Sequence, residues 1–329
     1  MRSKYFSGID SFKGILIILV IIGHVVLGNI EENLARYIIY KFHMPLFLAI
    51  TGYLITFKSL KLLSLSDLVE KYFYRMLLPW ILAFIFFYVL RNFKYIISSD
   101  LTLNDLILSL LYPYYHLWYI PSVFVMVLLI WLLVKFKLSL KFILVSSAVF
   151  TVIWLATNEN GQNASNIVFT IMGDKRTYYF FVYLFIGFYL RNIKYLQISK
   201  QICITATLFL GLFVFADFFL NFSNYVSETV ELSFNISLIY LLLNYYKEIN
   251  FGETIKNIGV NSLPIYLWHP LIILVIERVF QETYLYYVLS SVIMVIFIYC
   301  VIYLKRFKII NKFLFGNYNK NPKKIAVNE

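Results

Sequence analysis

The chain has 329 residues, of which 61% are hydrophobic and 14% charged, and its mean hydropathy is +0.77. Soluble domains average about 45–50% apolar and about 25% charged residues. The composition therefore argues against a soluble enzyme, a nucleic-acid-binding module and a disordered chain, and it predicts an all-α, polytopic membrane protein.

Ten apolar runs approach the roughly 20 residues that a helix needs to cross the hydrocarbon core. They cover residues 12–28, 37–57, 73–90, 117–134, 142–156, 178–190, 202–220, 230–246, 263–279 and 285–304. A further apolar piece, 103–112, is interrupted by polar residues and is expected to be interfacial or re-entrant. The sequence thus predicts about ten transmembrane helices.

The distribution of basic residues predicts the orientation of these helices. If the N-terminus is cytoplasmic, 22 of the 29 Lys and Arg fall in cytoplasmic segments and 7 in outer ones. This asymmetry predicts a multi-pass protein of the inner (cytoplasmic) membrane with both termini in the cytoplasm. We expect residues 1–304 to form the transmembrane domain and residues 305–329 a basic tail on anionic lipid. The net charge of +12 then reflects topology and contact with membrane lipids, with no nucleic-acid partner.

All four histidines lie in or at the edge of apolar runs, at positions 24, 43, 116 and 269. An ionisable group inside a membrane is costly and usually faces a cavity or a partner. The alternative is a hydrogen-bonded histidine with a structural role. The two cysteines, Cys203 and Cys300, share no CxxC spacing, so we expect neither a disulfide framework nor a metal site.

Lys13 and His24 in the first run are 11 residues apart, which puts them on one face of a helix about 16 Å from each other along the axis. Asp10 precedes Lys13 by three residues and lies close to the same face. As an alternative, Asp10 and Lys13 are ordinary interfacial residues with extended side chains. That alternative does not explain why Lys13 lies on the same helix face as His24.

The other polar positions also have two interpretations. His43 precedes Pro45, which predicts a kink beside a cavity or a helix-packing contact. Arg75 lies at the cytoplasmic boundary of the third run, either as a positive-inside anchor or as a phosphate ligand. Trp118 and Tyr266 are expected either in the interfacial aromatic belt or at a sugar-binding wall.

Several motifs occur in order along most of the chain. They are Asp10-x-x-Lys13-Gly14, Lys13-(x10)-His24, Phe42-His43-Met44-Pro45-Leu46-Phe47, Thr51-Gly52-Tyr53-Leu54, Arg75-Met76-Leu77-Leu78-Pro79, His116-Leu117-Trp118, Gly187-Phe188 and Ile265-Tyr266-Leu267-Trp268-His269. Together they resemble the membrane acyltransferase-3 family, and within it the sugar O-acetyltransferases of the fucose-4-O-acetylase type. That family moves an acyl group, usually acetyl, from cytoplasmic acyl-CoA to a sugar hydroxyl.

The resemblance implies that acetyl-CoA is the acyl donor, with no metal cofactor, and that Lys13 and Arg75 bind its phosphates. The family's Arg-x-x-Arg element falls on Tyr72 and Arg75, so its first arginine is absent here. Lys71 is one position away and is expected to substitute for it.

The resemblance also implies the catalytic residues. His24 is either the general base that deprotonates the acceptor hydroxyl or a nucleophile that carries the acyl group. Asp10 is expected to orient Lys13, and His43 to bond the acyl carbonyl or the acceptor.

The expected acceptor is a sugar or polysaccharide, free or lipid-linked, with His116, Trp118, Tyr266 and His269 as substrate-binding residues. Glycan-assembly proteins are expected partners. Two other functions remain open on the sequence: a polysaccharide exporter or flippase without acyl transfer, and a structural subunit of a glycan-assembly complex. The first gives no reason for the common face of Lys13 and His24, and the second leaves four buried histidines without a role.

Overall fold

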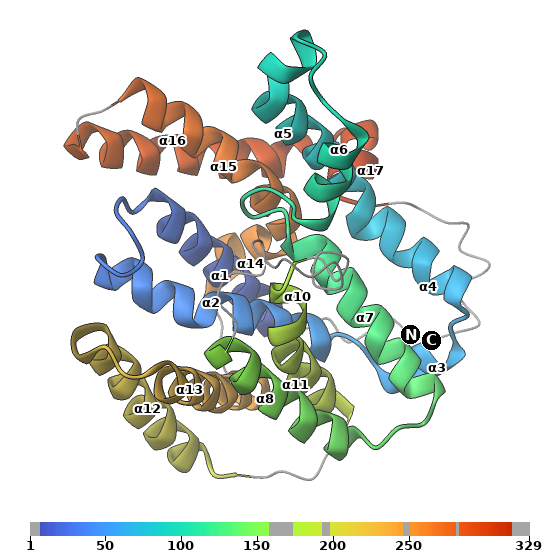
Figure 1. Cartoon of the computed structure of the whole chain (residues 1–329), viewed down its shortest axis with the longest axis vertical. Coiled ribbons are helices and arrows are strands. Elements are labelled where there is room, and N and C mark those ends of the chain that lie inside the picture. The colour runs from blue at the N-terminus through green and yellow to red at the C-terminus, as the bar shows by residue number, and fades with distance from the viewer. Residues whose placement is uncertain (1–6, 158–173, 193–197, 246–250, 281–282, 318–329) are drawn as a thin grey trace.

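Every regular element in the described residues is helical, which confirms the predicted all-α class (Figure 1). The computed structural model describes residues 7–157, 174–192, 198–245, 251–280 and 283–317. The helices are α1 (Ser7–Val25), α2 (Leu34–Tyr53), α3 (Phe57–Leu62), α4 (Leu65–Tyr72), the π-helix η1 (Phe73–Leu77), α5 (Leu78–Ile97), α6 (Leu103–Leu111), α7 (Tyr119–Lys135), α8 (Leu140–Thr157), α10 (Arg176–Tyr179), α11 (Phe181–Asn192), α12 (Lys200–Leu220), α13 (Asn224–Tyr245), α14 (Gly252–Val260), α15 (Ser262–Val279), α16 (Thr283–Leu304) and α17 (Lys308–Leu314).

Six helices in the described part of the chain are long and apolar enough to cross a membrane. They are Ser7–Val25, Leu65–Ile97, Lys200–Leu220, Asn224–Tyr245, Ser262–Val279 and Tyr284–Leu304. The other four predicted runs fold as α2, α7, α8 and α11. Helices α7 and α11 have 17 and 12 residues, α2 is interrupted by Arg36 and Lys41, and the part of α8 whose side chains are described, Leu140–Val152, forms a shorter apolar helix. The predicted interfacial piece at 103–112 forms α6, which begins at a capping box made by Thr102 and Asp105.

Large apolar side chains cover the outer faces of α12 and α16. Leu208 and Leu212 of α12 are 66% and 67% exposed, and Val295 and Ile296 of α16 are more than half exposed. A water-soluble surface rarely carries apolar patches of this extent, whereas lipid tails solvate them without cost. These two helices therefore present lipid-facing surfaces.

Two helix pairs approach closely through glycine. Gly187 of α11 faces Ala49 of α2, and Gly52 of α2 faces Leu184 of α11; a Cβ on either glycine would overlap the facing carbonyl oxygen. In the same way, Gly259 of α14 faces the carbonyl of Asp10 in α1. Small residues permit such backbone approach between membrane helices. Helix α1 also packs on α2 and α15 and lies between them (Figure 1).

Candidate active site

Three histidine rings from distant parts of the sequence meet beside α1. His24 of α1 and His116, from the segment before α7, both contact His269 of α15, with ring centroids 5.2 Å and 5.5 Å away. His269 is fully buried, His116 is 4% exposed and His24 is half-buried. The sequence predicted a functional role for each, and the fold brings them into one cluster, which we call the histidine cluster.

Backbone carbonyls determine which ring nitrogens carry protons in two of these histidines. His269 Nδ1 donates to the carbonyl of Tyr266 at 2.8 Å, and His116 Nε2 donates to the carbonyl of Leu267 at 3.0 Å. A carbonyl oxygen only accepts, so each of these nitrogens bears a hydrogen, and in the neutral ring the other nitrogen is an acceptor. Those acceptors, His269 Nε2 and His116 Nδ1, are buried and lack a hydrogen-bond partner among the described residues. The cluster therefore presents two lone pairs that require a donor.

Two prolines leave backbone carbonyls without their helical N–H donors, so side chains can donate hydrogen bonds to them. Pro270 has no N–H, so the Tyr266 carbonyl four residues earlier loses its helical donor and accepts from His269 instead. Pro45 leaves the carbonyl of Lys41 in α2 free in the same way, and Asn235 Nδ2 of α13 donates to it at 2.9 Å. Unpaired backbone groups inside a membrane are costly, so a side chain that satisfies them is held firmly in place.

His43 lies one aromatic ring away from the histidine cluster. Its ring centroid is 5.1 Å from that of Tyr40, which in turn is 6.2 Å from His24. His43 Nδ1 donates to the carbonyl of Ile39 at 2.6 Å, and the side chain is 5% exposed. The structure thus separates His43 from the other three histidines by Tyr40.

The cationic side chains that were predicted to bind phosphate line one cavity of about 310 Å³. Its lining includes Lys13, Lys71 and Arg75, and also the deeper residues Tyr119 and Tyr266. Lys13 Nζ pairs with Asp10 Oδ1 at 3.1 Å, as the common helix face predicted. None of the lining residues among those described is acidic. The cavity is therefore cationic at Lys13, Lys71 and Arg75 and otherwise largely apolar.

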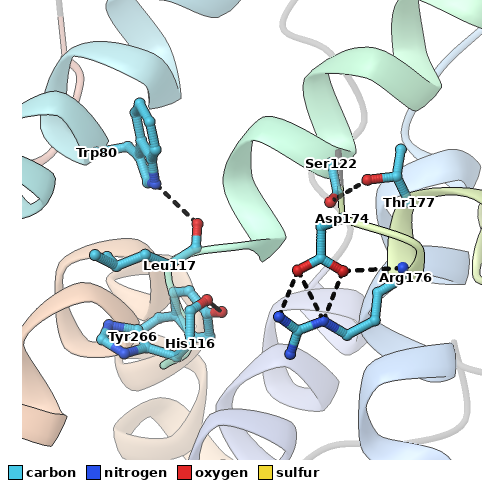
Figure 2. A network of polar contacts seen from close by, with 8 residues as sticks. All are labelled: Trp80, His116, Leu117, Ser122, Asp174, Arg176, Thr177 and Tyr266. Carbon is cyan, nitrogen blue, oxygen red and sulfur yellow. Dashed lines mark hydrogen bonds and ion pairs between the residues drawn. The ribbon is translucent and has the colours of Figure 1, made fainter. Parts of the chain in front are cut away.

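Tyr266 connects this cavity to the histidine cluster. Its ring lines the cavity and contacts the rings of His116 at 5.1 Å and His269 at 6.1 Å. Its hydroxyl donates to the backbone carbonyl of His116 (Figure 2). The cavity that holds the predicted donor-binding residues therefore adjoins His116 and His269 through one tyrosine, and His24 joins them through its contact with His269.

A local change of helix type presents Arg75 to the cavity. Pro79 cannot donate to the carbonyl of Arg75, and the chain widens into the π-helix Phe73–Leu77, where the Leu78 N–H bonds to the carbonyl of Phe73. Such π-turns are rare and occur frequently at functional sites. Lys71, Tyr72 and Arg75, which lie before and within this turn, all line the same cavity.

The chain beyond α17 also reaches this cavity, which the sequence did not indicate. Phe315 and Asn317 line it, and Gly316, with φ +66°, packs against the backbone carbonyl of Arg75. Part of the segment predicted to be a tail on lipid thus contributes to the wall of the site. The rest of that segment, 318–329, lies outside the described residues.

Trp118 lies in a polar network beside the histidine cluster rather than on the described cavity. The Arg176 guanidinium lies 4.4 Å from its ring centroid, and Phe180 stacks with it at 5.5 Å. Arg176 is held in turn by Asp174, with Nε 2.9 Å from Oδ1 (Figure 2). The ring is 6% exposed. Sequence reasoning treated Arg176 only as an outer-loop cation, because nothing in its spacing indicates this contact.

Similarity to known protein families defines the class of protein. A family model described as an acyltransferase domain, of the acyltransferase-3 type, matches residues 6–305. The chain therefore belongs to the acyltransferase-3 family, as its motifs indicated, and is a membrane acyltransferase by family.

At the level of individual proteins, the chain is similar to the nodulation protein NolL of Sinorhizobium fredii (strain NBRC 101917 / NGR234). The two are 36% identical over 149 residues, which make up 43% of this chain and 40% of NolL. The match thus spans less than half of that relative. No solved structure matches the chain.

Proposed function

We propose that this protein is an O-acetyltransferase of the inner membrane. In this proposal it moves acetyl from cytoplasmic acetyl-CoA to a hydroxyl of a surface polysaccharide or a lipid-linked sugar. Ten membrane helices, with both termini in the cytoplasm, belong to the same proposal. The observation that carries it is the single cavity that contains Lys13, Lys71 and Arg75 and also Tyr266, which touches the histidine cluster.

The donor end of the cavity fits the chemistry of a coenzyme A thioester. The cavity has three cations and no acidic residue in its lining, although Lys13 is paired with Asp10 beside it, and such a lining suits phosphate groups. The guanidinium of Arg75 suits bidentate phosphate contact. Apolar lining residues such as Met44, Ile50 and Ile120 suit the pantetheine arm. Asp10 pairs with Lys13 and so orients its ammonium group.

Proton transfer is the role of His24 in this proposal. Neutral imidazole takes the proton of the sugar hydroxyl as its oxygen attacks the thioester carbonyl, and the carbon–sulfur bond breaks. The imidazolium then gives that proton to the departing thiolate, so the products are the O-acetyl ester and free coenzyme A. In this proposal His116 Nδ1, a buried acceptor with no hydrogen-bond partner among the described residues, accepts a hydrogen bond from the sugar hydroxyl.

His24 as nucleophile is the second form of the same reaction. The imidazole would attack the thioester carbonyl, release the thiolate and carry the acetyl group to the sugar oxygen. In both forms the reaction takes place beside His269 and His116. His43 and Trp118 stay predicted substrate-contacting residues, and their rings contact Tyr40 and Arg176 respectively.

The proposal is tested by mass spectrometry of the surface polysaccharide from cells with and without the gene. We expect each repeating unit to lose the mass of one acetyl group when the gene is absent. An unchanged acetate content would contradict the proposal. Loss of the entire polysaccharide would instead indicate an exporter or flippase.

A further inference from the structure

The ring of His24 lacks an orienting hydrogen bond. Among the described residues, its contacts are ring contacts with Tyr40 at 6.2 Å and His269 at 5.2 Å, and no hydrogen bond to its nitrogens is present. A general base works efficiently when a third group fixes its orientation and tautomer. The proposed base therefore needs a partner that accepts its ring N–H.

His269 lacks a hydrogen-bond donor at one of its ring nitrogens. Its proton lies on Nδ1, which donates to the carbonyls of Tyr266 and Ile265 at 2.8 Å and 3.1 Å. Its Nε2 is a fully buried acceptor without a donor. Leaving a buried acceptor unpaired is costly, so a donor is expected to reach it in the working state of the protein.

Of the three rings in contact with His269, only that of His24 can supply the donor. His116 cannot donate, because its proton is used on the carbonyl of Leu267 and its remaining nitrogen is itself an acceptor. The hydroxyl of Tyr266 is used on the carbonyl of His116. Trp268 Nε1 is unpaired, but adjacent helical residues point about 100° apart, and its ring packs on Phe86 and Phe87 of α5.

The spacing of the two rings fits a hydrogen bond between them. An imidazole nitrogen lies about 1.1 Å from its ring centroid, so an N–H···N bond of about 3 Å places two centroids about 5.2 Å apart. The centroids of His24 and His269 are 5.2 Å apart. No hydrogen bond joins the two rings as they stand, so the half-buried ring of His24 must turn to direct an N–H at His269 Nε2, whereas His269 is held by two carbonyls.

We propose that His269 is a positioning residue for His24. Its Nε2 accepts the ring N–H of His24, so the other nitrogen of His24 stays an unprotonated lone pair directed at the acceptor hydroxyl. When that nitrogen takes the hydroxyl proton, the bond to His269 persists and stabilises the imidazolium until the proton passes to the thiolate. This role rests on the proposed acetyl transfer and extends it to a second histidine.

Two substitutions of His269 separate its two hydrogen bonds. His269→Asn keeps an N–H near Nδ1 for the Tyr266 carbonyl but has no group at the position of Nε2. His269→Gln places an amide oxygen near Nε2, where it can accept from His24. Trp268→Phe is the matched control, since it removes an unpaired N–H from the adjacent position of the same helix.

The assay follows transfer of radiolabelled acetyl from acetyl-CoA to the host glycolipid and polysaccharide fraction in inverted membrane vesicles. We expect His269→Asn to lower kcat about tenfold or more with the KM for acetyl-CoA unchanged, and His269→Gln to recover part of the loss. Trp268→Phe should stay within about twofold of the wild type. The double variant His24→Ala/His269→Asn should be no slower than His24→Ala alone, because His269 acts through His24.

Several outcomes overturn the proposal. A wild-type kcat in His269→Asn overturns it. It is also overturned if the decrease in kcat of the double variant equals the product of the decreases in the two single variants, because His269 then acts independently of His24. If His269→Asn does not accumulate in the membrane, the same comparison is made with His269→Phe, which has no acceptor at the position of Nε2, alone and combined with His24→Ala. Absence of acetyl transfer by the wild type would refute the acetyltransferase function itself. If His24→Ala loses transfer activity as expected but His269→Asn keeps full activity, only the positioning role is refuted.

Discussion

His269 Nδ1 lies 2.8 Å from the carbonyl oxygen of Tyr266, the carbonyl that Pro270 leaves without its helical N–H. A missing backbone donor thus determines the tautomer of a fully buried histidine. Pro270 therefore influences which ring nitrogen of His269, namely Nε2, keeps its lone pair inside the protein.

Pro270→Ala tests that connection. The alanine N–H restores a helical donor to the Tyr266 carbonyl and competes with His269 for it, so the His269 ring becomes less well fixed. We expect kcat for acetyl transfer to fall several-fold, about threefold to tenfold, while the melting temperature in detergent stays equal or rises, since proline is unfavourable inside a helix. A variant with wild-type kcat would show that the carbonyl does not orient His269.

Arg75→Ala tests the donor end of the cavity. Removing the guanidinium should raise the KM for acetyl-CoA about tenfold, the worth of one charge-assisted hydrogen bond, with a smaller effect on kcat. Lys71→Ala is expected to act in the same direction. Lys135→Ala is the matched control, because Lys135 is an exposed cation that bonds the backbone of Lys61 and does not line the cavity. An unchanged KM in Arg75→Ala would exclude a phosphate contact.

Gly316→Ala tests whether the segment after α17 helps to form the site. A Cβ at this position would overlap the Arg75 carbonyl, and the positive φ of +66° adds strain. The segment should therefore move off the cavity and raise the KM for acetyl-CoA several-fold, about threefold or more. Proteolysis near residue 316 should become faster in the same variant. If both measurements match the wild type, the contact with Arg75 has no role in donor binding.

Gly187→Ala tests the packing of α11 on α2. The added Cβ would overlap the carbonyl of Ala49, so the two helices must separate. We expect a loss of about 1–3 kcal/mol, seen as a lower melting temperature in detergent. Gly211→Ala in α12 is the matched control: its Cβ would lie 3.4 Å from the Phe234 ring, with no closer atom. This control should be neutral or gain about 0.5–1 kcal/mol from helix propensity, and equal stability of the two variants would refute the packing argument.

Periodicity and charge predicted much of the fold. The all-α class, the common helix face of Asp10 and Lys13 and the apolar runs that became helices follow directly from the sequence. The lengths of α2, α7 and α11 did not follow from it, because apolar runs do not mark where turns and kinks interrupt a helix. The described structure has six helices that meet the requirements for crossing a membrane, and ten spans are part of the proposed topology.

The candidate site was predictable in its members but not in its arrangement. His24, His116 and His269 were each indicated by their burial in apolar sequence, yet their meeting depends on how α15 packs on α1. The cover of Trp118 by Arg176 and the approach of Gly316 to Arg75 are contacts between distant segments. No local pattern in a single sequence encodes such contacts.

The central claim is that His24 carries out acetyl transfer, and one comparison tests it most directly. Wild-type protein and His24→Ala are measured in inverted vesicles for transfer of radiolabelled acetyl from acetyl-CoA to the glycolipid and polysaccharide fraction, at equal amounts of membrane-inserted protein. We expect a loss of about 10²–10⁴-fold in His24→Ala, the usual contribution of a general base. Transfer at the wild-type rate in His24→Ala would contradict it.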